Sequence, residues 1–252
     1  MESLSSRKNA YIRHVRQLAG DAAYRLEQGE YLCDGMKTLR EALRFGAEVR
    51  SVLWKDQPRA VEGLSCERQY IAPEELFDYA SPMQHSPGPL FCVAIPAQDR
   101  RSPLRNAIVL ENVQDPGNVG TVIRTANALG TDAVILVGAC ADLYQPKTVR
   151  ATMGAIFRQR VLRMELEELC AFLAGRGLPL YGAALCRGAR DVREVSLSRA
   201  AVAVGSEGQG LSEALLERCR EKIIIPMNPD SESLNAAVAA ALLMWEGSRE
   251  RE

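Results

Sequence analysis

Five short apolar runs in the second half of the chain constrain the fold more than any other feature of the sequence. They are NAIVL, DAVILV, LPLYGAAL, AAVAV and KIIIP, at residues 106–110, 132–137, 178–185, 200–204 and 222–226. Each is bounded by Gly, Pro or Asp, and helical patterns separate them at residues 119–129, 146–157, 166–174, 212–220 and 234–245. Strands that are apolar on both faces are typical of a parallel sheet covered by helices. We therefore predict an α/β fold for this half.

The first half is predicted to be a smaller α/β domain. Its pattern predicts helices at residues 7–18, 36–45 and 73–79, and strands at residues 31–33, 49–54, 69–71 and 90–95. The stretch PAQDRRSPLR, residues 96–105, has two prolines, four charges and no apolar periodicity, which is typical of a linker. The predicted domains are therefore residues 1–95 and 106–252, and both have ordinary domain sizes.

Composition excludes several classes of protein. The 252 residues carry a net charge of −1, which argues against nucleic-acid binding by bulk electrostatics. A local basic patch or a solvated helix face would both explain Arg7, Lys8, Arg13 and Arg16. We expect a cytoplasmic protein, because no apolar run is long enough to span a bilayer or to resemble a signal peptide. The seven cysteines form no C-x-x-C pair and only two histidines are present, so we expect reduced thiols and no metal site.

The loop after the run NAIVL is the first of three polar loops. Ligands of parallel α/β sheets bind beyond the carboxyl ends of the strands, so these loops should carry the function. In ENVQDPGNVGTVIRTANALG, Pro116 and Gly117 predict a turn and Asn118 can cap the helix. Arg124 follows inside a helix whose other residues are small or apolar. An ordinary surface arginine is the alternative explanation.

The second loop, GSEGQGLSEAL, follows the run AAVAV and places Gly205, Gly208 and Gly210 around Glu207. Its glycine order is G-x-x-G-x-G, which differs from the dinucleotide fingerprint G-x-G-x-x-G. The loop offers bare backbone groups and one carboxylate, which suit a neutral polar ligand such as an adenine or a ribose. A common glycine-rich turn would explain the same residues.

The third loop follows the run KIIIP and introduces an alanine-rich helix with Asp230, Ser231, Glu232, Ser233 and Asn235. One such residue is enough to cap a helix, so the surplus indicates a second role. We expect the polar side chains of the three loops to form one cluster at an edge of the sheet. Neither histidine lies in this half and no glycine-lysine phosphate loop is present, so a Ser-His-Asp triad and a Walker A site are excluded.

In this order the three loops resemble the motifs of the SpoU/TrmH family, which are SPOUT-class RNA ribose 2′-O-methyltransferases. The matching positions are Asn118, Gly120 and Arg124 in the first loop, Gly205, Glu207, Gly208 and Gly210 in the second, and Pro226, Met227, Ser233, Leu234 and Asn235 in the third. The stretches PKTVRATMGAIF and YLCDGMKTLREAL also resemble the family, so the resemblance covers nearly the whole chain. The sequence departs from the family at Ala237, where a small polar residue is common, and in the turn NPDSE.

The resemblance implies a fold, a cofactor and a set of site residues. The fold would be a C-terminal methyltransferase domain with a trefoil knot, preceded by a substrate-binding domain for RNA. S-adenosylmethionine would lie in the knot, held by backbone groups of Gly205, Ile225 and Leu234. The catalytic residues implied are Asn118, Arg124, Glu207, Ser233 and Asn235. The resemblance also implies a homodimer.

Alternatives remain open for the substrate and for the activity. Ribosomal RNA is the expected substrate, because residues 1–95 resemble the corresponding domain of rRNA-modifying relatives; transfer RNA is the alternative. A non-catalytic RNA-binding protein could keep the fold, but it would not need the polar set. Arg124 could act as general base or as a phosphate clamp. We favour the clamp, because a guanidinium holds its proton tightly and its planar fork matches a phosphate.

Overall fold

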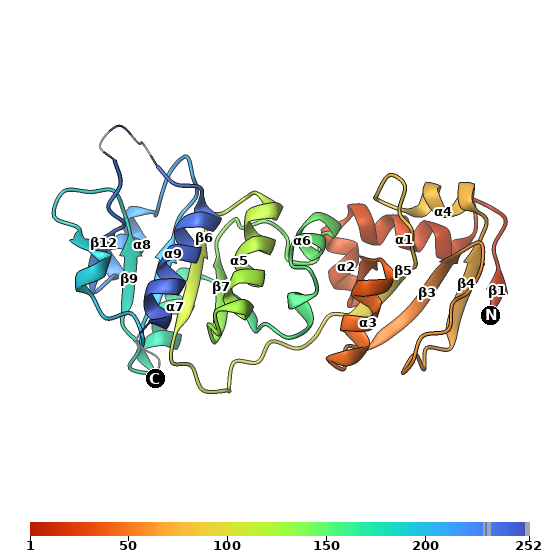
Figure 1. Ribbon diagram of the computed structural model, residues 1–252, viewed down its shortest axis with the longest axis horizontal. Helices are drawn as coiled ribbons and strands as arrows, with labels where there is room; N and C mark the ends of the chain where they lie inside the picture. Colours follow the sequence, from red (N-terminus) through yellow and green to blue (C-terminus); the bar gives the residue numbers. More distant parts are fainter. Residues whose placement is uncertain (229, 231–232, 250–252) are drawn as a thin grey trace. The chain divides into compact units, whose positions relative to one another are not determined.

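The computed structural model describes residues 1–228, 230 and 233–249, and the chain forms two compact units (Figure 1). Unit 1 comprises Met1–Ala97 and Asp142–Arg158. Unit 2 comprises Gln98–Ala141 and Gln159–Glu252. The chain therefore leaves unit 2 once, contributes a short segment to unit 1, and returns.

Unit 2 is built on a seven-stranded sheet in the order β10-β12-β9-β11-β6-β7-β8. Every neighbouring pair in this order is parallel, which confirms the predicted α/β class. The strands are β6 (Ala107–Glu111), β7 (Ala133–Val137), β8 (Val161–Met164), β9 (Leu180–Ala183), β10 (Arg190–Asp191), β11 (Ala201–Val204) and β12 (Glu221–Ile224). The central strands β6, β7 and β11 are buried along their whole length, as their apolar sequences require.

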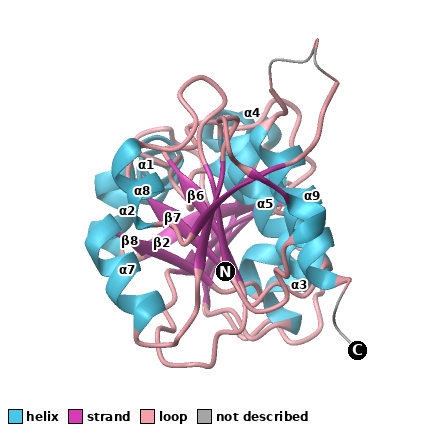
Figure 2. Ribbon diagram, turned by 90° about the vertical axis from the view of Figure 1, so that its left-hand side faces the viewer, coloured by secondary structure: helices cyan, strands magenta, loops and turns pink. Residues whose placement is uncertain are grey.

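Helices cover both faces of this sheet (Figure 2). They are α5 (Pro116–Ala128), α7 (Leu166–Ala174), α8 (Glu213–Arg218) and α9 (Ala236–Ser248), with a 3₁₀ turn η2 (Val192–Glu194). Figure 2 shows α5 and α9 on one side of the strands and α7 and α8 on the other. The alanines at the start of α9 are buried, because small side chains allow the helix backbone to approach the sheet closely.

Unit 1 contains a five-stranded mixed sheet in the order β1-β4-β3-β5-β2. Its strands are β1 (Glu2–Ser3), β2 (Glu30–Asp34), β3 (Val49–Lys55), β4 (Arg68–Ala72) and β5 (Leu90–Ala94). β5 pairs antiparallel with β2 and β3, and the other pairs are parallel. The helices are α1 (Ala10–Gly20), α2 (Ala22–Gln28), α3 (Met36–Arg44) and α4 (Glu74–Ala80). The unit is α/β, as predicted.

The segment Asp142–Arg158 differs from the predicted domain limits, because its side chains belong to the core of unit 1. It contains α6 (Pro146–Ala151) and the 3₁₀ turn η1 (Ala155–Phe157). Val149 and Ile156 lie in one buried cluster with Tyr31 and Trp54. The guanidinium of Arg25, whose side chain is 5% exposed, donates from Nε and Nη2 to Asp142 Oδ2 at 3.0 and 2.5 Å. Apolar packing and a largely buried ion pair therefore hold this segment.

The same segment was predicted as one helix over residues 146–157, but the structure interrupts it after Ala151. Met153 and Gly154 both have positive φ angles, of 50° and 86°. A right-handed helix does not tolerate this backbone geometry, and the chain restarts as the 3₁₀ turn η1. The break was not visible in the sequence, because Ile156 and Phe157 are apolar at the positions where an unbroken amphipathic helix would also have apolar residues.

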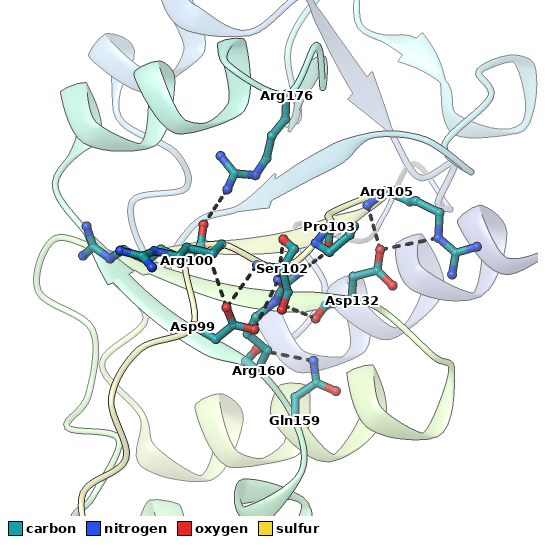
Figure 3. A network of polar contacts seen from close by, with 10 residues as sticks. Asp99, Arg100, Ser102, Pro103, Arg105, Asp132, Gln159, Arg160 and Arg176 are labelled. Atoms are coloured by element: carbon teal, nitrogen blue, oxygen red, sulfur yellow. Dashed lines mark hydrogen bonds and ion pairs between the residues drawn. The ribbon is translucent and has the colours of Figure 1, made fainter.

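The predicted linker is fixed to unit 2 from Gln98 onward by a network of arginines (Figure 3). Arg160 donates to the carbonyl oxygens of Ser102 and Pro103 at 3.0 and 2.9 Å. Arg176 donates to the carbonyl oxygen of Arg100. Asp99 accepts from the backbone N–H of Ser102 at 3.0 Å. Part of the stretch without periodicity is thus ordered by side-chain bonds to its backbone.

Most predicted elements are present within a few residues of their expected ends, and, in addition to the 3₁₀ turn η2, four short helices and strands were not predicted. These are α2, β1, β8 and β10. Asp21 ends α1 and its side chain caps α2, so a second helix begins directly after the one that the pattern predicted at residues 7–18. β8 has an exposed Arg163 and only four residues, which hid it from a search for apolar runs. None of the helices in the described residues is long and apolar enough to cross a membrane. The knot stays a prediction.

Candidate functional site

The three predicted loops meet at the ends of α5 and α9, where three side chains form a chain of hydrogen bonds. Asn235 Nδ2 donates to Asn118 Oδ1 at 3.0 Å. Asn118 Nδ2 in turn donates to Glu207 Oε1. The same carboxylate oxygen accepts from the backbone N–H of Ala236 at 3.4 Å. One residue from each loop therefore takes part, as the sequence predicted.

Helix capping fixes the direction of this chain. The Oδ1 atom of Asn235 caps α9 by accepting from the N–H groups of Ala237 and Val238 at 2.9 and 3.2 Å. Its amide nitrogen must then face Asn118, whose oxygen accepts and whose nitrogen faces Glu207. The last member receives donors only, and an ionised carboxylate meets this requirement. Asn235 thus serves both the cap and the cluster.

The loop that carries Glu207 is tightly closed. The N–H of Gly210 donates to the carbonyl oxygen of Ser206 at 2.8 Å, and Gly210 has a φ of 68°. A Cβ atom on Gly205 would lie 2.0 Å from the carbonyl carbon of Gly210, so no other residue fits there. Glycine is therefore required at Gly205 for close approach and is favoured at Gly210 by its left-handed backbone.

A pocket of about 390 Å³ opens beside this loop in unit 2. Its walls are mostly apolar and come from the ends of β9, β11 and β12 and from the start of α9. Gly205, Glu207, Ile225, Ser233 and Leu234 all line it. Size and lining are those of a site for a small organic ligand with a few polar groups.

Backbone groups of the pocket wall are available to a ligand. Within the described residues, the backbone N–H and C=O groups of Gly205, Ile225 and Leu234 make no hydrogen bond. Gly205 is also buried, and buried backbone groups without a partner are costly. These are the three residues for which the family resemblance implies backbone contacts to an adenine.

Arg124 lies outside the cluster. Its side chain is exposed on α5, and no hydrogen bond or ion pair joins it to another described residue. The predicted cluster is therefore present for Asn118, Glu207 and Asn235, with Ser233 on the pocket wall, whereas Arg124 takes part in neither the cluster nor the wall of this pocket. Ser231 and Glu232, which belonged to the polar surplus and to the turn NPDSE, lie outside the described residues.

One residue of this region was missed by the reasoning from sequence. Glu111, the last residue of β6, is only 4% exposed. Its carboxylate accepts from the backbone N–H and the hydroxyl of Ser212, both at 2.7 Å. The available signal was an acidic residue directly after four apolar ones in a strand that must be buried.

The core of unit 1 contains a separate cluster of polar side chains. His14, Glu30 and Cys92 each place one potential ligand atom within 4.8 Å of the others. The imidazole of His14 already bonds to Glu30 Oε1 and to the hydroxyl of Tyr24, both at 2.9 Å. Burial raises the pKa of the Cys92 thiol to about 12, so this thiol stays protonated at neutral pH. These contacts describe a hydrogen-bonded core network, and the absence of a metal ion stays a prediction.

Comparison with known proteins identifies the family. The model of the SpoU rRNA Methylase family matches residues 105–245. A 23S rRNA (guanosine(2553)-2′-O)-methyltransferase of Bacillus subtilis is 34% identical, over 97% of this chain and 98% of the relative. The SpoU methyltransferase AviRb of Streptomyces viridochromogenes, solved with AdoMet, superimposes with a TM-score of 0.87 and 29% identity, over 97% and 98% of the two chains. An rRNA methyltransferase of Sinorhizobium meliloti shares the fold, with a TM-score of 0.90 over 99% and 98% of the chains at 24% identity. With its three loops joined at one pocket, the chain belongs to the SpoU rRNA methylase family.

Proposed function

We propose that this protein transfers a methyl group from S-adenosylmethionine to a ribose 2′-hydroxyl of ribosomal RNA. The observation that carries the proposal is the hydrogen-bond chain from Asn235 through Asn118 to Glu207 at the rim of an apolar pocket. The named relatives support the reaction and the substrate, since the Bacillus subtilis protein is a 23S rRNA 2′-O-methyltransferase. A protein that only bound RNA would not need this joined polar set.

The pocket fits S-adenosylmethionine. Free backbone groups at Gly205, Ile225 and Leu234 can pair with the edge of an adenine, and the apolar walls can cover its ring. S-adenosylmethionine, when bound, supplies an activated methyl group on a sulfonium. The protein then has to bring the acceptor oxygen into line with that group, and positioning is the main source of acceleration in such a reaction.

The polar residues have separable roles in this proposal. Glu207 and Ser233 lie on the pocket wall, where both can hydrogen-bond to the ribose hydroxyl and the Glu207 carboxylate can accept its proton. Asn118 and Asn235 hold the Glu207 carboxylate in place from two helices. Arg124, exposed and without a protein partner in the described residues, can grip a phosphate of the RNA beside the target ribose.

Residues 1–95 are proposed to select the RNA. In unit 1 the guanidinium groups of Arg7 and Arg16 lie 4.6 and 4.1 Å from the ring centre of Tyr79. Such an arrangement offers stacked planar groups and positive charge on one surface, which suits a structured RNA. The domain boundary for an experiment has to respect the segment Asp142–Arg158, because deleting residues 1–95 would uncover the apolar side chains of Val149 and Ile156.

Arg124 provides the test of the reaction and of its mechanism. Arg124→Ala should retain S-adenosylmethionine binding by calorimetry and lose methyl transfer to an rRNA transcript. Arg124→Lys keeps the charge without the planar fork and should recover part of the activity and of the RNA affinity. Activity of Arg124→Lys that rises with pH at unchanged RNA affinity would instead identify a base. Methylation at the wild-type rate by Arg124→Ala would contradict both roles of Arg124. Preferential methylation of a transfer RNA transcript would contradict the proposal that ribosomal RNA is the substrate.

We also propose that the protein acts as a homodimer in the cytoplasm. Val238, Leu242 and Trp245 are 48%, 44% and 57% exposed, and their spacing places them on one stripe of α9. Together with Leu129, which follows α5, they line a groove, and an exposed apolar stripe of this kind is typical of a protein interface. Leu242→Glu should give a monomer in light scattering at micromolar concentration. A wild-type protein that is already monomeric there would contradict the dimer.

A further inference from the structure

The end of β6 carries a buried carboxyl group, that of Glu111, to which the proposed reaction assigns no role. Glu111 is 4% exposed and ends the strand that lies between β11 and β7 in the sheet. Its two oxygens accept from one residue, Ser212, through the backbone N–H and the hydroxyl, both at 2.7 Å. In the described residues no lysine or arginine pairs with this carboxylate.

Burial of an unpaired carboxylate is costly, and its stability depends on the donors that it finds. Charge-assisted hydrogen bonds are among the stronger ones, and two of them here converge on one residue. An apolar side chain would have filled the same space without the desolvation cost. We therefore explain the presence of Glu111 by its hold on Ser212, and not by a contribution to the free energy of folding.

Ser212 is the point at which the glycine loop joins α8. Its hydroxyl caps α8 by accepting from the N–H of Leu215 at 3.2 Å. The loop runs from Gly205 to Gly210 and is closed by the bond between Gly210 and Ser206. The end of β11 fixes the loop at Gly205, and Glu111 fixes the other side at Ser212. Glu207 lies between these two anchors, so a shift at Ser212 moves its carboxylate.

The residue after Glu111 anchors the other neighbouring strand. Asn112 has a φ of 55°, and its Oδ1 accepts from the N–H of Ala139 at 2.8 Å, just beyond β7. A non-glycine residue in this conformation is uncommon, and such strain is found where a local geometry has to be kept. The two consecutive side chains thus fix the loops that follow β11 and β7, on both sides of β6.

We propose that Glu111 is a positioning residue for methyl transfer: it holds Ser212 and thereby sets the place of the glycine loop and of Glu207. The inference rests on the proposed function, because it assigns the loop to S-adenosylmethionine. Glu111 does not touch the pocket, and it acts through Ser212.

The test compares Glu111→Ala with a matched control. Asn106→Ala removes a buried polar side chain, 6% exposed, that precedes the same strand at its opposite end and accepts from the N–H of Asp132 at 3.0 Å. Both variants should lose thermal stability. Only Glu111→Ala should raise the KM for S-adenosylmethionine and lower kcat, each about tenfold, as expected when a charge-assisted bond that places the loop is lost. Glu111→Gln should recover most of both, because its amide can face the N–H and the hydroxyl of Ser212 with its oxygen and nitrogen.

Two further variants keep the test decisive if Glu111→Ala does not fold. Ser212→Ala should shift KM and kcat in the same direction, and Ser212→Thr, which keeps the hydroxyl, should stay near the wild type. Values of KM and kcat within twofold of the wild type for Glu111→Ala or Ser212→Ala would overturn the inference. The same holds if Asn106→Ala changes them equally. Wild-type protein that neither binds S-adenosylmethionine nor methylates rRNA would instead overturn the proposed function.

Discussion

Asn118→Asp should disable the site through charge, because it replaces the donor that faces Glu207 by an acceptor. In the wild type the amide nitrogen of Asn118 donates to the carboxylate, and its oxygen accepts from Asn235. The substitution keeps the second bond and turns the first into a contact between two carboxylates. Asn118→Ala removes both bonds without adding a charge, and it is the matched control.

The size of the effect follows from the geometry. Two unit charges about 3 Å apart repel by roughly 1.4 to 2.8 kcal/mol at the high effective dielectric constant of an exposed site, taken as about 80 to 40. The lost charge-assisted hydrogen bond adds about 1.5 kcal/mol at the lower end of its range. The closed arrangement of the three loops should therefore be destabilised by about 3 to 4 kcal/mol at neutral pH. If S-adenosylmethionine binds only to this arrangement, its affinity falls by more than about a hundredfold.

The sign of the pH dependence distinguishes this mechanism from simple loss of a contact. Repulsion raises the pKa of the new carboxyl above the usual value of about 4. Below that raised pKa the pair shares one proton and the repulsion disappears, so affinity should recover as the pH falls from about 8 to about 5. Asn118→Ala lacks the new group and should show no such recovery beyond that of the wild type.

A second substitution reverses the donor and the acceptor. Glu207→Gln in the Asn118→Asp background supplies an amide nitrogen to the new carboxylate and an oxygen to the N–H of Ala236, so binding should improve over the single variant. Calorimetric titration of S-adenosylmethionine at several pH values measures all four proteins. Equal affinities of Asn118→Asp and Asn118→Ala at every pH, or a double variant no better than Asn118→Asp, would refute the assigned direction of the chain.

Further outcomes concern the core of unit 1. Asp142→Ala removes the ion-pair partner of the buried Arg25, whose guanidinium keeps its bond to the carbonyl oxygen of Leu18. Because the Asp142 carboxylate is 30% exposed, the free energy of unfolding of unit 1 should fall by about 2 to 3 kcal/mol, measured by urea unfolding with the fluorescence of the buried Trp54. The control Glu48→Gln changes a side chain that is 72% exposed and should alter this free energy by less than about 0.5 kcal/mol. Burial raises the pKa of the Cys92 thiol to about 12, so a thiol reagent at pH 8 should modify it only after unfolding, and rapid labelling of Cys92 in the native protein would contradict this core.

The elements that the sequence predicted well are those whose burial is uniform. β6, β7 and β11 are buried at every position, and their apolar runs marked them within a residue. β8 was missed because Arg163 interrupts its pattern. The helix break at Met153 and Gly154 depends on tertiary contacts, since a Cβ at Gly154 would lie 3.2 Å from the Cβ of Glu41. Distant residues set such a feature, and local periodicity does not contain it.

The site shows the same division between local and distant information. Loop position after a strand was enough to bring Asn118, Glu207 and Asn235 together, because parallel strands end at one edge. The sequence could not indicate that Arg124 would lie apart from them, since a helix residue can face several neighbours. The membership of Asp142–Arg158 in unit 1 was equally hidden, because its apolar residues suit either core.

Strand β6 explains how one chain can hold three loops in a fixed relation. The loop after β6 supplies Asn118, whose amide joins the Glu207 carboxylate to Asn235 at the start of α9. The last residue of the same strand is Glu111, whose carboxylate binds Ser212 at the end of the loop that carries Glu207. Glu207 is therefore fixed on two sides by groups that originate within eight residues of one strand end. Val109 of β6 is 0% exposed, so Val109→Ala leaves a cavity in the core and should displace the strand. We expect this substitution to weaken cofactor binding, although Val109 is not one of the site residues. Calorimetry would show it, and unchanged affinity in a folded but destabilised variant would mean that the loops hold their relation without the strand.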